Sequence, residues 1–592
     1  MTRYEYSPIP YGITDFERIR LDGYYYVDKT MFIPQLEFDA HFAFCLRPRR
    51  FGKSLLLNML ACYYDVAYAD RFDELFTGLD IHDNPTAERG KYLIMKFNFS
   101  RVDSNPGKVQ ESFNEVCLSS VKDFVDKYSA LLPEDALQRV LGESSCNMAM
   151  NAVCAMVKQA GQKIYLMIDE YDNFANTILS RNEGEYQKLT HGDGFFRLFF
   201  NCVKAYTTDN SPAVQRIFIT GVSPLTLSDV TSGFNIGFNL SMRPEYNELV
   251  GFSESQVRDM LDYYRAHTKV PDMTNDEVIA FIKPWYNNYC FAFRSLDKER
   301  MFNTDMVMYF MTYYIQGFLP DAMLDTNVST DYAKMQQLVR FESTYGEKTQ
   351  MLQGLLADGQ ICTYVNPEFT IQDMDSPDNL YSLLYYLGLL SFSGEDFGMP
   401  ILAIPNEVVR LQYCQYLSKC YANTLNFTQV AYNLDALMRA MAKDGAWKPF
   451  FEFIAESMQT VSSIRDYIDG ESFIKAFFLA NMSMGRENAY YDFPSELEYG
   501  KGYVDIVMSP RGPVKDLYLV ELKYCKADAS DAEIERLRAD AIDQLGKYSV
   551  GPDFQALVTR HGWNYHGIII VFRSWKMEVC EKIAIATYLC SR

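Results

Sequence analysis

Short runs of apolar residues recur along the first part of the chain, separated by stretches with helical periodicity. Three of these runs, at 41–46, 163–168 and 216–223, have the length and composition of buried strands, and a helical apolar run follows the first. Strands that alternate with helices predict right-handed crossovers and a mostly parallel sheet, with the functional groups at the carboxyl ends of the strands. The pattern therefore predicts an α/β fold with a site at that edge of the sheet.

A basic, glycine-containing turn directly follows the first predicted strand. Residues 47–54 read Arg-Pro-Arg-Arg-Phe-Gly-Lys-Ser. The Gly-Lys-Ser end is what a P-loop requires: a glycine where backbone approaches phosphate, a lysine for the β- and γ-phosphates, and a hydroxyl for Mg²⁺. Arg47 replaces the first glycine of the general consensus and Pro48 removes one backbone donor, so a basic turn that caps a buried helix is the alternative. The expected nucleotide-binding residues of this loop are Arg50, Gly52, Lys53 and Ser54.

Acidic and hydroxyl side chains follow the other two predicted strands. Asp169 and Glu170 end the second strand, and Thr220 lies near the end of the third. An acidic residue there can hold Mg²⁺ together with Ser54, and an adjacent glutamate can deprotonate the attacking water. We expect Asp169 as a metal ligand, Glu170 as the general base with Asp172 next in line, and Thr220 as a sensor of the γ-phosphate. The alternative is a solvated strand end.

Six short motifs together resemble one protein family. They lie at 11–16 (Tyr-Gly-Ile-Thr-Asp-Phe), 26–30 (Tyr-Val-Asp-Lys-Thr), 47–54, 168–172 (Ile-Asp-Glu-Tyr-Asp), 220–224 (Thr-Gly-Val-Ser-Pro) and 404–409 (Ile-Pro-Asn-Glu-Val-Val). This combination resembles the AAA-ATPase-like proteins of bacteria. The resemblance implies a P-loop NTPase core with ATP and Mg²⁺ as cofactors, and it makes an arginine at position 47 the usual form. It also implies a PD-(D/E)xK nuclease-like domain at the C-terminus.

Two strand-like runs within residues 503–523 carry the side chains that such a domain requires. Side chains alternate across a strand, so Glu521 and Lys523 share a face. A hairpin that also places Asp505 on this face brings two carboxylates and an ammonium together. This set suits Mg²⁺-dependent phosphodiester hydrolysis, with Asp505 and Glu521 as metal ligands and Lys523 positioning the water. A surface hairpin with ordinary charges is the alternative.

Two neighbouring segments resemble further parts of the nuclease-like site. Glu498 matches the acidic position ahead of the core aspartate and is an expected metal ligand, although Glu496 competes for that role. The stretch at 541–548 resembles the helix that contributes a glutamine and a lysine beside the site.

The organisation of the chain predicts three parts. We expect a P-loop AAA-like ATPase domain at 1–245, a lid or winged-helix-like and helical region at 246–480, and a C-terminal α/β restriction-endonuclease-like domain at 481–592. Ser253 and Gln256 predict a capped helix start, and helical periodicity dominates from about residue 306 onward.

Composition indicates an ordinary globular enzyme. The chain has 592 residues, of which 48% are hydrophobic and 22% charged. Its 13 cysteines are scattered without zinc-type spacing, which favours reduced thiols in a reducing compartment. The N-terminus lacks the apolar core of a signal peptide, and no apolar run approaches the ~18 residues of a membrane span. We expect a cytoplasmic protein without a membrane partner.

Charge argues against a simple nucleic-acid coat. The net charge is −21, and an acidic surface repels phosphate backbones. Residues 496–592 are nearly neutral, however, with 13 Lys and Arg against 14 Asp and Glu. The residues that could form a local basic strip there are Lys515, Lys523, Lys526, Arg536, Arg538 and Lys547.

Two classes of function follow. The first is an ATPase whose nucleotide state controls a metal-dependent nuclease that acts on DNA or RNA, in defence or mobile-element biology. The second is a nucleotide-switched binding module with an inactive, nuclease-like docking domain. The sequence also allows a homo-oligomer, in which an arginine from a neighbouring copy completes the ATP site. The arginines considered for this role are Arg181, Arg197 and Arg216.

Overall fold

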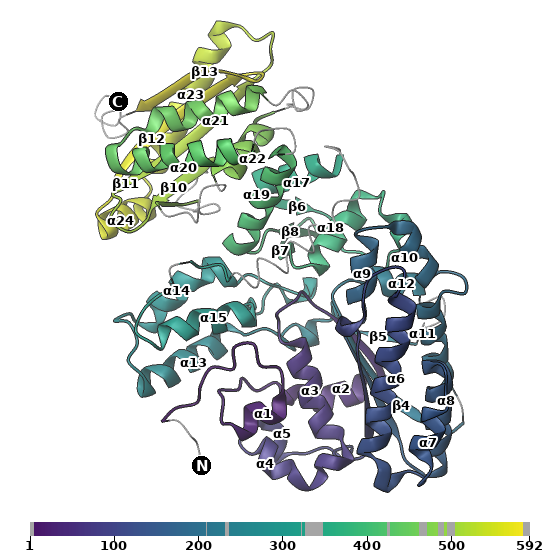
Figure 1. Ribbon diagram of the computed structural model, residues 1–592. Coiled ribbons are helices and arrows are strands. Elements are labelled where there is room, and N and C mark those ends of the chain that lie inside the picture. The colour runs from purple at the N-terminus through teal and green to yellow at the C-terminus, as the bar shows by residue number, and fades with distance from the viewer. Residues whose placement is uncertain are drawn as a thin grey trace. The chain divides into compact units, whose positions relative to one another are not determined.

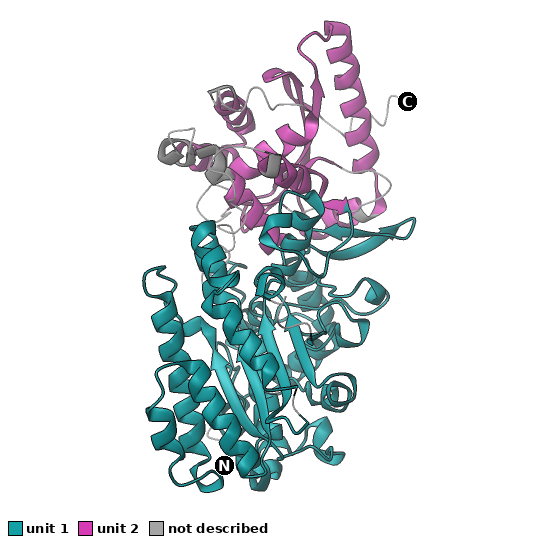
Figure 2. Cartoon of the chain, turned by 90° about the vertical axis from the view of Figure 1, so that its right-hand side faces the viewer, with its two compact units in different colours: residues 1–341, 362–405 teal, residues 342–361, 406–592 magenta. Residues whose placement is uncertain are grey.

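The computed structural model forms two compact units, which comprise Met1–Phe341 with Cys362–Pro405, and Glu342–Ile361 with Asn406–Arg592 (Figure 2). Each unit contains a sheet of five strands (Figure 1). The domain boundaries expected near 245 and 480 stay predictions. The residues that the structure describes are 5–208, 210–230, 236–320, 322–325, 347–422, 427–460, 470–482, 490–493 and 504–583.

The sheet of the first unit is entirely parallel, which confirms the predicted α/β fold. Its strand order is β2-β3-β4-β1-β5. The strands are β1 (Phe42–Leu46), β2 (Leu93–Asn98), β3 (Ile164–Asp169), β4 (Val214–Gly221) and β5 (Phe238–Asn239). The predicted strands are β1, β3 and β4, whereas β2, which has a lysine in its middle, and the two-residue β5 were not predicted. Because β4 lies between β1 and β3, the carboxyl ends of these three strands meet at one edge.

Helices pack against this sheet on the connections between its strands. Helix α3 (Lys53–Tyr64) contacts β2, β3 and β4, and α6 (Val109–Lys127) contacts β2. The others are α1 (Phe16–Leu21), α2 (Ile33–Asp39), α4 (Phe72–Phe76), α5 (Asp80–Asp83), α7 (Ala136–Leu141), α8 (Cys146–Gln159), α9 (Asn173–Leu179), α10 (Glu183–Thr190), α11 (Phe195–Ala205) and α12 (Leu225–Val230).

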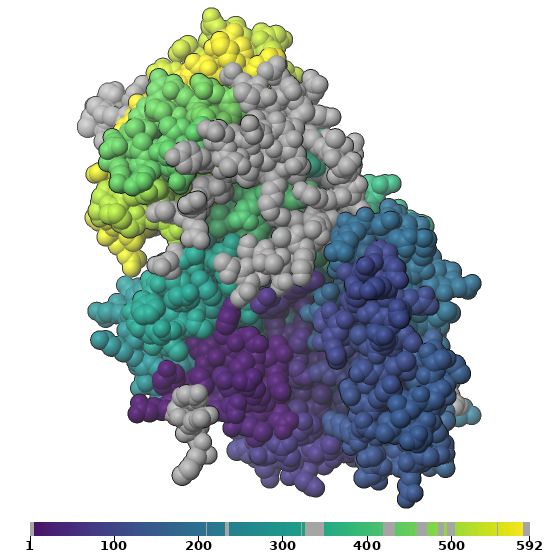
Figure 3. Space-filling model, viewed as in Figure 1, coloured from purple at the N-terminus to yellow at the C-terminus, as the bar shows by residue number. Residues whose placement is uncertain are grey.

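Aromatic side chains fill the space between the sheet and these helices. Phe97 of β2 packs edge-on against Phe199 of α11, with ring centroids 5.7 Å apart. Phe99 lies 5.1 Å from Phe113 of α6. Such pairs add about 0.5–1.5 kcal/mol to the burial of their area. In the space-filling view the residues of these helices form the blue surface beside the purple N-terminal segments (Figure 3).

The middle region is mainly helical, as predicted, and begins with α13 (Glu254–His267), α14 (Asn275–Tyr286) and α15 (Thr304–Tyr314). Ser253 and Gln256 form the predicted capping box at the start of α13. Later helices are α17 (Glu347–Asp358), α18 (Pro377–Tyr386), α19 (Glu407–Ala422), α20 (Phe427–Asp444), α21 (Trp447–Thr460) and α22 (Glu471–Met482).

A three-stranded sheet interrupts this helical region. Its strands, in the order β6-β8-β7, are β6 (Gln360–Cys362), β7 (Ser391–Asp396) and β8 (Met399–Ala403). Phe397 and Gly398 both have positive φ angles, of 47° and 84°, and form the turn between β7 and β8. The sequence did not predict this hairpin because β7 does not alternate: its first two residues are buried and its last four are mostly exposed.

The sheet of the second unit is mixed. Strands β11 and β12 are parallel and the other pairs antiparallel, in the order β13-β12-β11-β10-β9. Helix α23 packs on β11 and β12, whereas α22 contacts β11. The remaining elements are β9 (Tyr491–Asp492), β10 (Ile506–Pro510), β11 (Asp516–Cys525), β12 (Asn564–Arg573), β13 (Lys576–Ile583), α23 (Asp531–Ser549) and α24 (Pro552–His561). None of the helices in the described ranges has both the length and the apolarity for crossing a membrane.

Candidate functional site

The loop between β1 and α3 has the backbone of a phosphate-binding turn. Gly52 has a φ of 90° and Arg50 one of 68°, both in the left-handed region. Lys53 starts α3, and its Nζ donates to the carbonyl oxygens of Arg47 and Pro48 at 2.9 and 2.8 Å. The ammonium is therefore held inside the curve of the loop, close to the N-terminus of a twelve-residue helix whose dipole favours anions.

Arg47 turns away from this loop. Its guanidinium is 1% exposed and donates to the carbonyl oxygens of Leu46, Ser241 and Tyr246. It also lies 4.4 Å from the ring centroid of Phe291, in cation–π geometry. The arginine at the position of the first consensus glycine therefore connects β1 to residues 241–246, and its side chain leaves the loop open.

A cavity of about 320 Å³ adjoins the loop. Five expected site residues line it, namely Arg50, Gly52, Lys53, Ser54 and Glu170. Residues 10–14 and α15 supply further parts of its wall. Burial lowers the pKa of Lys53, an effect that the carboxylates of Glu170, Asp169 and Asp172 oppose. The cavity thus combines the buried ammonium of Lys53 and the hydroxyl of Ser54 with two carboxylates, those of Glu170 and Asp305, a set that fits a nucleoside triphosphate and Mg²⁺.

Asp169 and Thr220 lie behind this cavity. Thr220 is fully buried and donates from its hydroxyl to Oδ1 of Asp169 at 2.6 Å. Asp169 is 3% exposed at the end of β3. The register explains this arrangement, because Ile168 pairs with Ile219, and Cys45, two residues before Arg47, pairs with Thr220. Thr220 therefore lies between the candidate metal-side carboxylate and the strand that leads into the loop.

Glu170 has a strained backbone and faces the cavity. Its φ of 50° is rare for a residue other than glycine, and such strain is concentrated at functional sites. Its Oε2 accepts from Nδ2 of Asn173, which also lines the cavity, at 2.7 Å. Asp172, expected as the next candidate for the base, is 1% exposed instead. Its carboxylate accepts from the amides of Val222 and Ser223 and from Asn176, so it joins the turn after β4 to α9.

Helix α15 reaches the loop from the middle region. Arg50 NH1 lies 3.1 Å from Oδ2 of Asp305, and the Asp305 amide donates to the Arg50 carbonyl at 3.3 Å. The guanidinium of Arg50 is therefore paired with α15 at the rim of the cavity. This ion pair is only part-buried, and a phosphate would compete with Asp305 for it.

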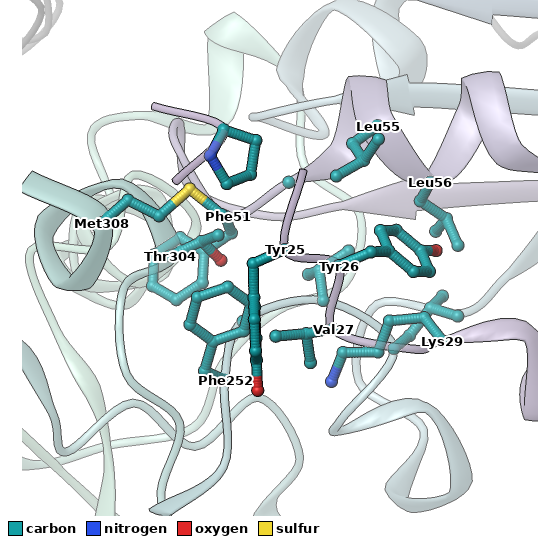
Figure 4. A pocket seen from close by; sticks show the side chains of 15 residues that line it. Tyr25, Tyr26, Val27, Lys29, Phe51, Leu55, Leu56, Phe252, Thr304 and Met308 are labelled. Atoms are coloured by element: carbon teal, nitrogen blue, oxygen red, sulfur yellow. The ribbon is translucent and has the colours of Figure 1, made fainter. Parts of the chain in front are cut away.

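A second cavity of about 40 Å³ shares Gly52, Thr304 and Met308 with the larger one. Apolar and aromatic side chains surround it (Figure 4). Lys29 also lines it, and burial lowers the pKa of this lysine to about 8. The Oγ1 of Thr304 is buried with no hydrogen-bond partner among the described residues. A space of this size holds one or two water molecules.

The structure excludes one of the arginines considered for a neighbour's ATP site. Arg216 is 5% exposed, lies near the amino end of β4 and has its Nε 3.3 Å from the Tyr92 hydroxyl. A buried side chain at the end of the strand opposite Thr220 cannot reach a second copy. Arg181 is exposed and Arg197 is half-buried on α11.

The second unit brings Asp505, Glu521 and Lys523 together. Strand β10 pairs with β11 so that Ile506 lies opposite Val520, and the Leu522 amide donates to Oδ2 of Asp505 at 2.8 Å. Lys523 Nζ donates to Oε1 of Glu521 at 2.8 Å. Both side chains of this pair are nearly buried. The hairpin register thus places Asp505 beside the Glu-x-Lys segment.

Helix α22 adds two charged residues that the sequence analysis missed. Glu471 Oε1 lies 3.8 Å from Lys523 Nζ, and Lys475 Nζ lies 3.8 Å from Oδ1 of Asp505. Their Glu-x-x-x-Lys spacing on a helix is the only signal that could have marked them, and it is common on helix surfaces. Glu498 and Glu496, the upstream residues expected near the site, lie outside the described residues.

The electrostatics of this cluster suit a divalent cation. Oε2 of Glu521 is buried without a hydrogen-bond partner in the described part of the chain. Burial raises the pKa of Glu521 to about 8, and the Asp505 carboxylate adds to the shift. Burial also raises the pKa of Glu471. No group of three metal-ligating side chains occurs among the described residues, but Mg²⁺ commonly binds one or two carboxylates and keeps its waters. Asp505 and Glu521 therefore fit such an ion.

Four of the six residues in the expected basic strip are paired with carboxylates, whereas Lys515 and Lys526 are exposed. Lys523 is buried in the cluster described above. Arg536 pairs with Glu533 and Asp540 on its own helix. Arg538 is paired with Glu581, and Lys547 with Asp543 at 2.5 Å. Gln544 and Lys547, expected beside the site, are both exposed on α23.

Family models match the two ends of the chain. Residues 10–231 match a family described as predicted AAA-ATPase, and residues 469–582 match the PD-(D/E)XK nuclease superfamily. The second match includes α22 and hence Glu471 and Lys475.

A similar bacterial protein and several solved structures were also found, and the description of the bacterial protein gives no function. The chain is 30% identical over 288 residues to a protein of Azotobacter chroococcum mcd 1 described as "Uncharacterized protein in vnfD 5′ region", and the match spans 48% of each chain. Among solved structures, Cdc6p of Pyrobaculum aerophilum has 9% identity and a TM-score of 0.25 over 71% of this chain and 97% of its own. The Orc1 protein of Aeropyrum pernix in complex with DNA has 10% identity and a TM-score of 0.25, over 66% and 90%.

We assign the fold from the strand order of the chain itself, because TM-scores of 0.25 are too low to support a shared fold. The Gly-Lys-Ser loop and strands β1 to β4 of the parallel sheet lie within the first matched region, and the Asp505 cluster with its mixed sheet lies in the second. Residues 10–231 therefore form an AAA-ATPase-like domain, and residues 469–582 form a C-terminal domain of the PD-(D/E)XK nuclease superfamily.

Proposed function

We propose that this protein binds and hydrolyses ATP and that its nucleotide state controls a Mg²⁺-dependent nuclease acting on DNA or RNA. A role in defence or mobile-element biology would fit this combination. The observation that carries the nuclease assignment is the orphaned, buried Oε2 of Glu521 beside Asp505 and Lys523. A carboxylate oxygen without a partner in a buried site is costly unless a proton or a cation satisfies it.

In the first unit, Lys53 would hold the β- and γ-phosphates and Ser54 would face the metal ion. Glu170 would accept a proton from the attacking water, oriented by its hydrogen bond from Asn173. Asp169 would be held in place by the hydrogen bond that the Thr220 hydroxyl donates to it. Mg²⁺ bound there would offset the negative charge of the phosphates.

In the second unit, Asp505 and Glu521 would hold the metal ion, and Glu521 would release its proton when the ion binds. The bound ion would polarise the scissile phosphate and lower the pKa of a water. Lys523 would steady the water or the developing charge, since it already lies 2.8 Å from Glu521.

A second function is favoured by the charges around the site. The chain has a net charge of −21, and Arg536, Arg538 and Lys547 are engaged in ion pairs. A surface of this kind has little general attraction for a polyanion. The alternative is therefore a nucleotide-switched binding module in which the nuclease-like domain only docks a partner.

Cleavage assays separate the two functions. Supercoiled plasmid, linear DNA and RNA would be incubated with Mg²⁺, with and without ATP, using the wild type, Lys53→Ala and Glu521→Gln. We expect cleavage by the wild type, none by Glu521→Gln, and loss of the ATP effect in Lys53→Ala. Glu521→Gln should hydrolyse ATP normally, which controls for its folding. ATP hydrolysis without cleavage of any of the three substrates would favour the binding module.

A further inference from the structure

Two charged residues on one face of α22 extend the candidate nuclease site. We propose that Lys475 is the counter-ion of Asp505 while no metal is bound, and that it binds a substrate phosphate once a divalent ion has taken this carboxylate. The inference rests on the proposed nuclease function and deepens it. In this proposal Lys475 of α22 is the cation that contacts a phosphate of the nucleic-acid backbone.

Packing fixes the position of α22. The helix contacts β11, and Phe478 packs against Phe572 of β12 with ring centroids 5.9 Å apart. The residues from Phe473 to Met482 other than Lys475 are buried. Because positions four apart lie on the same side of a helix, Glu471 and Lys475 both face the Asp505 cluster. A lysine amid such an apolar helix is costly unless it has a polar partner.

Hydrogen bonding directs one oxygen of Asp505 toward this lysine. Oδ2 of Asp505 accepts from the Leu522 amide at 2.8 Å, which orients the carboxylate. Oδ1 lies 3.8 Å from Lys475 Nζ, and the Asp505 and Lys475 side chains are only 15% and 18% exposed. Oδ1 of Asp505, the oxygen that does not accept from the Leu522 amide, is thus paired with the ammonium of Lys475. A divalent ion carries twice the charge of an ammonium and would displace it.

The two lysines of the cluster are held differently. Lys523 donates to Glu521 at 2.8 Å and is also 3.8 Å from Glu471. Lys475 has a single ion pair in the described residues, at 3.8 Å, which is longer than a hydrogen bond. Its four-carbon stem allows the ammonium to move without moving the helix. Lys475 is therefore the cation that metal binding releases most easily, and the released charge would remain beside the scissile phosphate.

Metal titration tests the first half of the proposal without nucleic acid. Mg²⁺ and Mn²⁺ would be titrated calorimetrically into the full-length wild type, Lys475→Met and Lys475→Arg. Loss of the competing charge should tighten metal binding by Lys475→Met by roughly tenfold, whereas Lys475→Arg should stay near the wild type. Lys448→Met is the matched control, because Lys448 forms an i,i+4 pair with Glu452 at 3.7 Å on α21. Unchanged or weaker metal binding by Lys475→Met, with the thermal unfolding midpoint retained, would overturn the counter-ion role.

Cleavage at saturating metal tests the second half. Supercoiled plasmid and single-stranded RNA would be the substrates, with kcat and KM measured separately. Lys475→Met should cleave on the order of 10-fold or more slowly although it binds metal more tightly, and Lys475→Arg should recover part of the rate. A purely structural lysine would not produce tighter metal binding together with slower cleavage. Equal rates for Lys475→Met and the wild type would overturn phosphate binding.

The two arms also separate this inference from the proposed function. If the wild type cleaves neither substrate, the nuclease function and the phosphate role of Lys475 both fail. The counter-ion role is then decided by the metal titration alone, because that measurement requires no activity.

Discussion

The hydroxyl of Thr220 donates a 2.6 Å hydrogen bond to Oδ1 of Asp169, across neighbouring strands. Both groups are buried. The Thr220 hydroxyl therefore orients the Asp169 carboxylate from β4, the strand that also pairs with β1. The expected sensor residue is therefore connected to the expected metal-side carboxylate, one layer behind the cavity at Lys53. The charge of Asp169 also acts on Lys53 in the loop, where it opposes the lowering of the lysine pKa by burial.

Replacing Thr220 by valine should slow ATP hydrolysis while leaving ATP binding largely intact. The variant keeps the shape of the side chain but removes the donor, so Asp169 loses its orientation. Hydrogen bonds to charged groups are worth about 1.5–3 kcal/mol, and we expect a loss of stability of that order. Turnover at saturating Mg²⁺-ATP and denaturant unfolding would measure the two effects. Turnover equal to the wild type would show that this hydrogen bond has no part in hydrolysis.

Lys53→Ala should abolish measurable ATP binding. The ammonium is already directed into the loop by two carbonyl oxygens, and its removal eliminates the charge that meets the β- and γ-phosphates. Two charge-assisted contacts at about 1.5–3 kcal/mol each correspond to at least ~100-fold in affinity. Calorimetry would measure it, with Lys188→Ala as control, since Lys188 is a largely exposed lysine paired with Glu185. Equal affinities in Lys53→Ala and the wild type would remove the P-loop interpretation.

Glu170→Gln should bind ATP but turn it over on the order of 10²-fold more slowly, the usual scale of a general base. The amide cannot accept the proton of water, and it keeps the size of the side chain at the cavity wall. Phosphate release at saturating ATP would measure the rate. Unchanged turnover would assign the base to a residue other than Glu170.

Asp172→Asn serves as the structural contrast to Glu170→Gln. The amide cannot accept equally from the backbone donors of Val222 and Ser223, so this variant should lose about 1–3 kcal/mol of stability. A lower free energy of unfolding for Asp172→Asn than for Glu170→Gln would identify Asp172 as the structural carboxylate and leave Glu170 as the catalytic one.

Arg47→Gly, which restores the general consensus, should destabilise the protein. The change removes the Arg47 hydrogen bonds to three carbonyl oxygens and the contact with Phe291, although the Tyr246 carbonyl keeps the Leu249 amide as a donor at 3.3 Å. Each buried group left unsatisfied costs about 1–3 kcal/mol, so we expect a total loss of at least ~2 kcal/mol. Urea unfolding would measure it, with Arg181→Gly as an exposed control. A variant as stable as the wild type would contradict the structural role of this arginine.

The unfolding of the protein should depend on pH through Asp492. Burial raises the pKa of Asp492 to about 6 from its ordinary 3.8, although Arg511 opposes the shift. Between these values the folded state holds a proton that the unfolded state has lost, so stability falls as the pH rises through this window and levels off above it. Asp492→Asn should show a shallower decline in thermal midpoint from pH 4 to 6. Parallel profiles for variant and wild type would contradict the raised pKa.

Local sequence patterns were sufficient to predict several parts of the first unit. Strands β1, β3 and β4 are short apolar runs with polar ends, and the Gly-Lys-Ser turn needs only one strand and one helix. These signals lie within a few neighbouring residues, where steric preferences and burial act directly. Likewise, the alternation along β11 was sufficient to place Glu521 and Lys523 on one face.

Which side chains face the two sites depends on how distant segments of the chain pack together. Arg47 points to residues 241–246, Asp172 joins the turn after β4 to α9, and Arg216 is buried at the amino end of its strand, away from the site. From α22, Lys475 reaches Asp505 and Glu471 reaches Lys523, although each pair is thirty or more residues apart in the chain. These contacts join segments far apart in the chain, and an isolated charge in the sequence looks the same whether it faces water, a carbonyl oxygen or a carboxylate. Packing of one element on another selects among these partners.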